Sequence, residues 1–187
     1  MSSHPNNKTF KPLSIAVLTV SDTRNEDTDT SGLLLKEKLL EAGHQLAEKK
    51  IIKDDLFHIR AVLSDWIHRS DVQVVLITGG TGFTPRDNTP QAVKPLFIFD
   101  VPGFGELFRH ISYGEINTST VQSRALAGIA NGTLIACMPG STNACRTAWN
   151  KILKDQLDST HKPCNFVEHL KTAEVHSDHI DGCETRG

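Results

Sequence analysis

The chain lacks the features that would direct it to a membrane or to a polyanion. No apolar run in its 187 residues approaches the roughly 20 needed to span a bilayer, and its polar start, MSSHPNNKTFKP, has no apolar signal core. Its 20 lysines and arginines against 22 aspartates and glutamates give a formal charge of −2, without the positive excess that a nucleic-acid surface requires. We therefore expect a soluble, cytoplasmic protein with no membrane association and no nucleic-acid partner.

Cysteine is scarce as well. The four cysteines are Cys137, Cys145, Cys164 and Cys183. They form no C-x-x-C pair and are too few for a disulfide framework in a chain of this length, so we expect reduced thiols. We expect Cys137 to lie in the core.

The length suits one domain, because typical domains contain about 100–200 residues. We expect a flexible N-terminal segment over residues 1–12, a single domain over residues 13–170 and a disordered tail over residues 171–187. The tail holds four residues of metal-binding type, His176, His179, Asp181 and Cys183. Since structural zinc sites hold their ligands in a folded frame, we interpret this group as an adventitious metal binder.

Short apolar runs bounded by turn residues predict strands of a parallel sheet at Ser14–Val20, Val72–Thr78 and Thr133–Pro139. Helical periodicity predicts one helix from an N-cap at Thr30 or Ser31 to Gly43, and another begun by Asp54 or Asp55, with an outer strand at residues 46–52 between them. This order predicts an α/β three-layer sandwich, in which a central, mostly parallel sheet has helices on both faces.

Further helices are expected in the second half of the chain. Thr89 and Pro90 have the N-cap and first-turn pattern of a short helix. Residues 101–116 and 118–128 are interpreted as two short helices inserted before the third strand, and residues 141–157 as a final amphipathic helix.

Three loops follow the three predicted strands: SDTRNEDTD, the loop after Thr78, and PGSTNAC. Ligands of open α/β sheets bind beyond the carboxyl ends of the strands. Because all three loops are rich in turn residues and hydroxyls, we expect them to form one composite site.

The loop LITGGTGFTPRDNTP holds Gly79, Gly80 and Gly82, which let backbone N–H groups approach an anion closely. It fits neither common phosphate-binding pattern, because Phe83 follows Gly82 where a Walker loop has lysine, and Pro85 takes the third glycine position of the dinucleotide fingerprint. An anion-binding loop and an ordinary turn both remain open at this point.

The carboxylate of Asp87 would be unfavourable next to a phosphate bound by this loop, unless a divalent cation lies between the two. The alternative is that it caps the next helix or pairs with Arg86. Asp54 and Asp55 could supply another carboxylate to the same cation, but their local sequence favours the alternative role of a helix cap. Asp22 and Glu106 are further acids near the predicted loops, with solvation as their simplest role.

The segments TVSDTR, TGGTGFTPRDNTPQAV, VPGFGELFR, SRALAG and MPGSTNACRTAW, in this order and spacing, resemble the MoaB/MogA family of molybdenum cofactor biosynthesis proteins. The match extends from about Leu13 to Val167 and is more similar to the MoaB branch. The resemblance implies homotrimers or homohexamers. It also implies adenylyl transfer: the terminal phosphate of molybdopterin attacks the α-phosphate of ATP, giving adenylyl-molybdopterin and pyrophosphate with Mg²⁺.

The resemblance places the two metal-associated acids of the family at Asp54 and Asp87. It assigns the pterin and nucleotide pocket to Ser21, Thr78, Gly79, Gly80, Thr81, Gly82, Glu106, Ser112, Ser123, Arg124, Pro139, Gly140 and Ser141. The MoaB-like third-strand segment leaves one alternative, a protein that binds molybdopterin or a nucleotide such as GTP with little or no turnover. Because both acids are present, we favour the enzyme.

Overall fold

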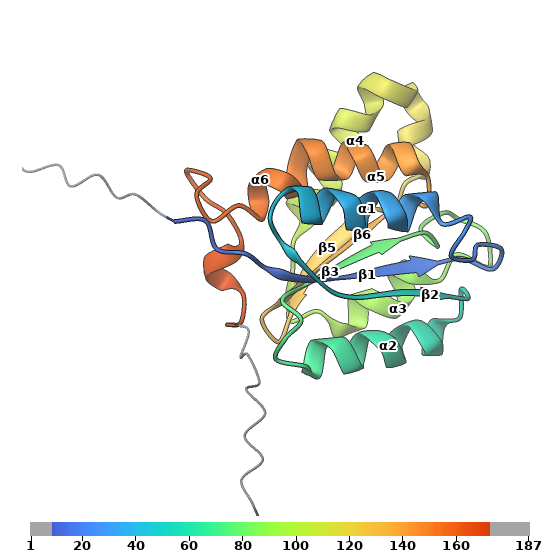
Figure 1. The fold of residues 1–187 in the computed structure, drawn as a ribbon. Helices are drawn as coiled ribbons and strands as arrows, with labels where there is room; N and C mark the ends of the chain where they lie inside the picture. Colours follow the sequence, from blue (N-terminus) through green and yellow to red (C-terminus); the bar gives the residue numbers. More distant parts are fainter. Residues whose placement is uncertain (1–8, 173–187) are drawn as a thin grey trace, which may run out of the picture.

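The computed structural model describes residues 9–172, which fold around a six-stranded sheet (Figure 1). The strands lie in the order β2 (Gln45–Ile52), β1 (Ser14–Val20), β3 (Val74–Thr78), β6 (Thr133–Met138), β5 (Leu126–Ala130) and β4 (Phe99–Asp100). The first four strands are parallel to one another, whereas β5 pairs antiparallel with both β6 and β4. The predicted mostly parallel sheet is confirmed.

Helices cover both faces of this sheet (Figure 1). One core cluster lies beneath α1 (Thr30–Glu41), α4 (Pro102–Ile116) and α5 (Thr142–Ala148), and the other lies beneath α2 (Leu56–His68) and α3 (Thr89–Val93). In β3, Leu76 packs in the first cluster while Val75 and Ile77 pack in the second. Because both faces are buried, the strand is apolar at successive positions rather than alternating. The predicted three-layer sandwich is therefore confirmed.

Short helical segments complete the connections, at Lys94–Leu96, Asn117–Gln122 and Val167–His169. The final helix is continuous with α5 through a π-helical turn at Trp149–Leu153 and ends in α6 (Lys154–Gln156). Within residues 9–172, no helix has the length and apolar character needed to cross a bilayer.

Two of the predicted helix starts are wrong by one residue. Asp29, not Thr30 or Ser31, caps α1 and accepts a hydrogen bond from the backbone N–H of Gly32. Asn88, not Thr89, precedes α3 and makes no side-chain cap. All of these residues are of a type that favours the N-cap, so local sequence does not choose among them.

The predicted second short helix, over residues 118–128, is also wrong in its last part. Residues 101–116 do form a helix, α4, and a 3₁₀ segment follows it, but Leu126 begins strand β5. Asn131 and Gly132 have φ values of 48° and 70° and join β5 to β6 as a hairpin. The Asn-Gly pair signals such a turn, whereas the small residues of Leu126–Ala130 give little strand signal of their own.

Residues at both margins of the expected domain are held against it. Phe10 packs on His44, and the backbone N–H of Lys11 donates to Ser159 Oγ at 2.8 Å. At the other margin, the N–H of Lys171 donates to the carbonyl of Gly132 at 2.9 Å. Phe10, Lys11 and Lys171 thus contact the domain, although they lie in the terminal segments assigned from sequence. Residues 1–8 and 173–187, with His176, His179, Asp181 and Cys183, lie outside the described residues.

The cysteines that the structure describes are free thiols, and Cys137 is fully buried, as predicted. Burial raises the pKa of Cys137 well above its ordinary range and that of Cys145 to about 11. Both thiols are therefore protonated, unreactive members of the core.

Candidate functional site

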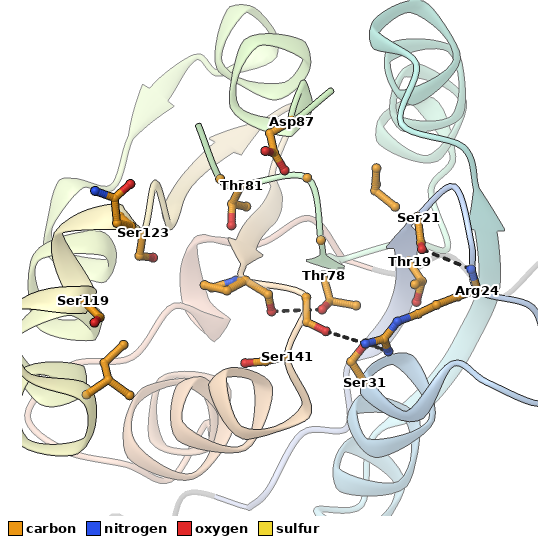
Figure 2. A pocket seen from close by; sticks show the side chains of 18 residues that line it. Thr19, Ser21, Arg24, Ser31, Thr78, Thr81, Asp87, Ser119, Ser123 and Ser141 are labelled. Atoms are coloured by element: carbon orange, nitrogen blue, oxygen red, sulfur yellow. Dashed lines mark hydrogen bonds between the residues drawn. The ribbon is translucent and has the colours of Figure 1, made fainter. Parts of the chain in front are cut away.

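A pocket with a volume of about 600 Å³ opens at the carboxyl ends of β1, β3 and β6 (Figure 2). The loops that follow these strands all contribute to its lining, which confirms that the three loops meet. The fourth wall comes from the end of α4 and the 3₁₀ segment after it. Such a volume lies within the range of small-molecule sites.

The glycines after β3 allow this loop to turn beneath the pocket. Gly79 and Gly80 have φ values of 101° and 63°, a region that side chains rarely adopt. A Cβ at Gly79 would lie 2.2 Å from the carbonyl oxygen of Val20, and one at Gly140 would lie 3.3 Å from Gly79 Cα. The ends of β1, β3 and β6 can therefore come together because Gly79 and Gly140 have no side chain.

Asp87 lines the pocket and is held by its own loop. Its Oδ2 accepts hydrogen bonds from the backbone N–H of Thr84 at 2.8 Å and from Thr84 Oγ1 at 2.6 Å. Burial raises the pKa of Asp87, but these bonds and one from the Gly82 backbone outweigh burial and leave the pKa below its ordinary value. Asp87 does not pair with Arg86, whose guanidinium lies 2.6 Å from Asp22 instead.

Asp54 lies behind the glycine loop, where a Cβ at Gly80 would be 2.4 Å from its Oδ2. It does not cap α2, because Asp55 does so by accepting from the His58 N–H at 2.7 Å. Asp54 Oδ1 instead accepts from the Asn88 N–H at 3.0 Å. The alternative roles considered for Asp54 as a cap and for Asp87 as a partner of Arg86 are thereby excluded.

The two acids differ in their electrostatics. Burial raises the pKa of Asp54, the hydrogen bonds from Asn88 oppose this, and the charges of Asp87 and Asp22 raise it further. No lysine, arginine or histidine within residues 9–172 forms an ion pair with Asp54. The same part of the chain contains no group of three or more His, Cys, Asp or Glu side chains placed to hold a metal ion.

Arg24, which we did not predict as a site residue, lines the pocket from the β1 loop (Figure 2). Its Nη1 donates to Ser31 Oγ at 2.9 Å and its Nη2 to the carbonyl of Gly140 at 3.0 Å. Its anchoring partner Gly140 is 116 residues away in the sequence, so composition and spacing gave no sign of this role.

The other predicted residues fall into three groups. The residues that line the pocket are Ser21, Thr78, Gly79, Gly80, Thr81, Gly82, Ser123, Pro139, Gly140 and Ser141. Ser112 is buried and lines a smaller adjoining cavity of about 100 Å³. Glu106 is exposed on α4 and is absent from the lining of both cavities.

Two of the predicted residues act on the loops themselves. Arg124 Nη2 donates to the backbone carbonyl of Asp87 at 2.8 Å, and its guanidinium lies over the exposed ring of Phe83. Ser141 caps α5 by accepting from the Ala144 N–H at 3.1 Å. These contacts hold the β3 and β6 loops in place around the pocket.

Further lining residues were missed because they lie in helical or strand segments that we assigned to the scaffold. These are Thr19 and Val20 at the end of β1, Ser31 at the start of α1, and Ile116, Ser119 and Gln122 around the end of α4. The pocket wall therefore consists mainly of hydroxyl side chains and glycines.

Comparisons with known proteins agree on one family. Residues 16–159 match the family model described as "Probable molybdopterin binding domain". The chain is 57% identical to molybdenum cofactor biosynthesis protein B of Escherichia coli K12 over 162 residues, which are 87% of this chain and 95% of that protein.

Solved structures show the same likeness. A crystal structure of a molybdenum cofactor biosynthesis protein B matches with a TM-score of 0.78 at 45% identity, covering 80% of this chain and 94% of the other. The tungsten cofactor synthesizing protein MoaB from Pyrococcus furiosus matches with a TM-score of 0.70 at 38% identity, covering 78% and 92%. The chain thus belongs to the MoaB/MogA family of molybdenum cofactor biosynthesis proteins, on its MoaB branch.

Proposed function

We propose that the protein binds molybdopterin and ATP in this pocket and transfers AMP to the molybdopterin phosphate. A terminal phosphate oxygen of molybdopterin attacks the α-phosphorus of ATP. A new P–O bond forms there as the bond to the β-phosphate breaks, and pyrophosphate leaves with the electron pair. Membership of the family supports the pterin substrate, and the chemistry of the pocket supports the nucleotide.

The observation that carries the proposal is the pair Asp54 and Asp87 beside a glycine loop. Two carboxylates raise the free energy of a bound polyphosphate unless a cation separates them from it. Asp54 has no basic ion-pair partner within the described residues, and its pKa is raised by burial and then by the neighbouring acids. A site with this excess of negative charge is suited to a divalent cation.

A magnesium ion fits these residues. Mg²⁺ is usually held by one or two carboxylates together with substrate phosphates and waters, so a larger cluster of protein ligands is not needed. Asp54 and Asp87 would hold it, and when bound it would neutralise the charge that develops on the departing pyrophosphate.

The chain's own groups bind and orient the reactants. The backbone N–H groups of Gly80 and Thr81 can donate to phosphate oxygens, and the hydroxyls of Thr81 and Ser123 add donors around the same space. Holding two anionic reactants in line is the main requirement of this transfer, because the attacking phosphate is already a nucleophile.

No protein nucleophile or base is needed, because the attacking phosphate oxygen is already anionic. Lysine, histidine and cysteine are absent from the residues that line the pocket. Cys145 lies below it, bonded to Thr78 Oγ1 at 3.1 Å, with a pKa raised by burial to about 11. Ser141 is engaged as a helix cap. Direct transfer between the two substrates is the mechanism that this set of side chains supports.

The test is an adenylyltransfer assay under anaerobic conditions. The protein is incubated with molybdopterin and Mg²⁺ and either ATP or GTP, and pyrophosphate and nucleotidylated pterin are measured together. We expect product with ATP, and none when EDTA replaces Mg²⁺. Calorimetry on the same sample separates the two functions: tight pterin binding by a folded protein that forms no product would contradict the enzyme and support the binding protein.

We also propose that the protein assembles as homotrimers or homohexamers. Ile98 and Phe99, at the edge strand β4, have 67% and 66% of their surface exposed, and Leu107 of α4 is also exposed. An apolar sheet edge of this kind invites association with another chain. Analytical ultracentrifugation should give three or six chains per particle. Phe99→Lys places a charge on the apolar edge and should shift the assembly towards monomers. A monomeric wild type would contradict this proposal.

A further inference from the structure

Arg24 and Asp87 are the charged side chains among the residues that line the pocket. They come from different loops, and in Figure 2 they lie on either side of Thr78. Each is fixed by its own set of contacts, Asp87 by Thr84 and Arg24 by Ser31 and Gly140. The pocket therefore has an acidic end and a basic end.

The guanidinium of Arg24 has more donors than its hydrogen bonds within residues 9–172 use. A guanidinium has five N–H groups, and Arg24 uses two of them in hydrogen bonds to groups within residues 9–172. Its side chain is 28% exposed and lines the pocket. Arginine offers this combination of fixed direction and charge to phosphate oxygens better than any other side chain.

A buried carboxylate lies behind Arg24. Asp29 is 2% exposed, and its Oδ1 lies 3.8 Å from Arg24 Nη1. Its Oδ2 accepts from Thr19 Oγ1 at 2.9 Å and pairs with Lys49 Nζ at 2.9 Å. Lys49 also pairs with Glu26 at 3.1 Å, so Asp29 belongs to a charge network that fixes it in place next to the guanidinium.

We infer that Arg24 binds a phosphate group of the ligand and that Asp29 is the residue that positions it. The inference rests on the proposed function for the class of ligand, a phosphorylated pterin or a nucleotide. It adds to that function a division of the pocket. At the β1 loop a phosphate is held by Arg24, whereas at the β3 loop a phosphate is held by backbone N–H groups and the cation.

Loss of Arg24 should leave the fold intact, because other contacts hold the same loops together. Thr30 Oγ1 and Thr142 Oγ1 lie 2.8 Å apart, and the Gly140 backbone packs on Gly79. Thr30→Val therefore serves as a control that weakens the junction and keeps the charge. Arg146→Gln removes an equal charge from an exposed position on α5 outside the pocket lining.

The experiment compares ligands that differ by one phosphate, in EDTA and without oxygen. Equilibrium binding is measured for molybdopterin against dephosphorylated molybdopterin, and for AMP against adenosine. The quantity of interest is the ratio of affinities within each pair, because it isolates the phosphate. The pair whose ratio depends on Arg24 identifies which phosphate the arginine binds.

We expect Arg24→Gln to lower this affinity ratio at least about tenfold in one pair, because the loss of a hydrogen bond to a charged group weakens binding by about that factor or more. Arg24→Lys should recover part of the ratio, and Asp29→Asn should lower it by a smaller factor. Thr30→Val and Arg146→Gln should leave it within about twofold of the wild type, which is the scatter expected of substitutions that touch no partner of the ligand.

Two results would overturn the inference. One is an unchanged ratio in both pairs for Arg24→Gln, including the case in which the wild type shows no preference for phosphate. The other is an equal loss of affinity for both members of a pair, which would make Arg24 a tether between loops. Failure of the adenylyltransfer assay leaves these ratios readable, so the two proposals fail separately.

Discussion

The β1 loop and the β3 loop face each other across the pocket, and they fix their charged side chains in different ways. Asp87 in the β3 loop is held by Thr84 and Gly82, three and five residues away. Arg24 in the β1 loop is held by Gly140, in the loop that follows β6, and lies 3.8 Å from the buried Asp29. The Asp87 carboxylate is thus held by its own loop, whereas the Arg24 guanidinium depends on a residue 116 positions away, so substitutions at the two side chains should have different consequences.

The largest effect is expected at the acidic end, from Asp87→Asn. The asparagine oxygen can still accept from Thr84, so the loop is preserved while the charge that would hold the cation is lost. Turnover should fall by on the order of 10²–10³, as when one preorganised charge-stabilising group is removed. Steady-state release of pyrophosphate measures this, with thermal unfolding as the check that the fold is intact. Wild-type turnover in the variant would exclude Asp87 from the reaction.

At the basic end the main expected effect of Asp29→Asn is on stability. Removing the charge leaves Lys49 with the exposed Glu26 as its remaining ion-pair partner within residues 9–172, and the loss of the buried pair costs about 3 kcal/mol in free energy of unfolding. Burial raises the pKa of Asp29, but Lys49, Gly32 and Thr19 lower it below the ordinary 3.8. The unfolded state therefore binds the proton more tightly, so the contribution is present above about pH 3.8 and is lost as the pH falls through the folded-state pKa.

Urea unfolding of the wild type and Asp29→Asn at a series of pH values checks this. The wild type should exceed Asp29→Asn in unfolding free energy by the whole amount near pH 7, and this difference should decrease towards acid pH. Asp65→Asn, at an exposed position on α2, is the control and should change the stability little at any pH. A difference independent of pH would show that the carboxylate charge of Asp29 is not what stabilises the fold.

The backbone of the β3 loop should be the next most sensitive feature. Gly79→Ala places a methyl group 2.2 Å from the Val20 carbonyl in a residue with φ of 101°, and we expect a loss of about 2 kcal/mol. Gly114→Ala is the matched substitution, because this glycine lies in α4 with open space around its Cβ position, and it should stabilise by about 0.5–1 kcal/mol. Chemical denaturation measures both, and equal effects would contradict the close approach.

The same contrast explains what could be predicted from the sequence. Strand β1 is found at Ser14–Val20, as expected, because a continuous apolar run between polar turns identifies a strand buried on both faces. The β3 loop could also be predicted, since its glycines, threonines and acid lie within one short segment. The meeting of the three loops followed from the rule that parallel strands end at one edge of the sheet.

Features that depend on distant partners could not be predicted in this way. Asp29 stands in the polar run NEDTDTS, and its choice as cap depends on Lys49 of β2 and Thr19 of β1. Arg24 acquires its position from Gly140. Strand β5 forms because β6 offers it a partner after the Asn131-Gly132 turn, although small residues make Leu126–Ala130 a weak strand in isolation.

A moderate effect is expected for Asp54→Asn on the response to Mg²⁺. At about ten times the dissociation constant, Mg²⁺ should stabilise the wild type by about 1.4 kcal/mol, which raises the Tm by about 3 °C in a protein of this size. The variant should respond less than half as much, and Asp65→Asn should respond like the wild type. The assay is a thermal melt with Mg²⁺ titrated against EDTA, and an unchanged response in Asp54→Asn would contradict its role as a ligand.

Without metal, Asp54→Asn should not destabilise the protein at neutral pH. The pKa of Asp54 is raised in the folded state, first by burial and then by the nearby acids, so the folded state binds its proton more tightly than the unfolded state. Its carboxylate therefore reduces stability as the pH rises through that pKa, and the asparagine avoids this cost. The same melts in EDTA, at a series of pH values from about 3.8 upward, should show the stability of the variant increasing relative to that of the wild type as the pH rises.

The smallest effect is expected from the ion pair that joins the two loops at the surface. Arg86 Nη2 lies 2.6 Å from Asp22 Oδ2, but the Arg86 side chain is 74% exposed. Exposed pairs contribute about 0–1 kcal/mol and weaken with salt. A double-mutant cycle with Arg86→Gln and Asp22→Asn, measured by urea unfolding at low and high salt, should give a coupling below about 1 kcal/mol that falls at high salt. A larger, salt-independent coupling would mean that this surface ion pair joins the two loops, whereas the geometry indicates that they are joined through the β6 loop, where Arg24 bonds to Gly140 and Gly140 packs against Gly79.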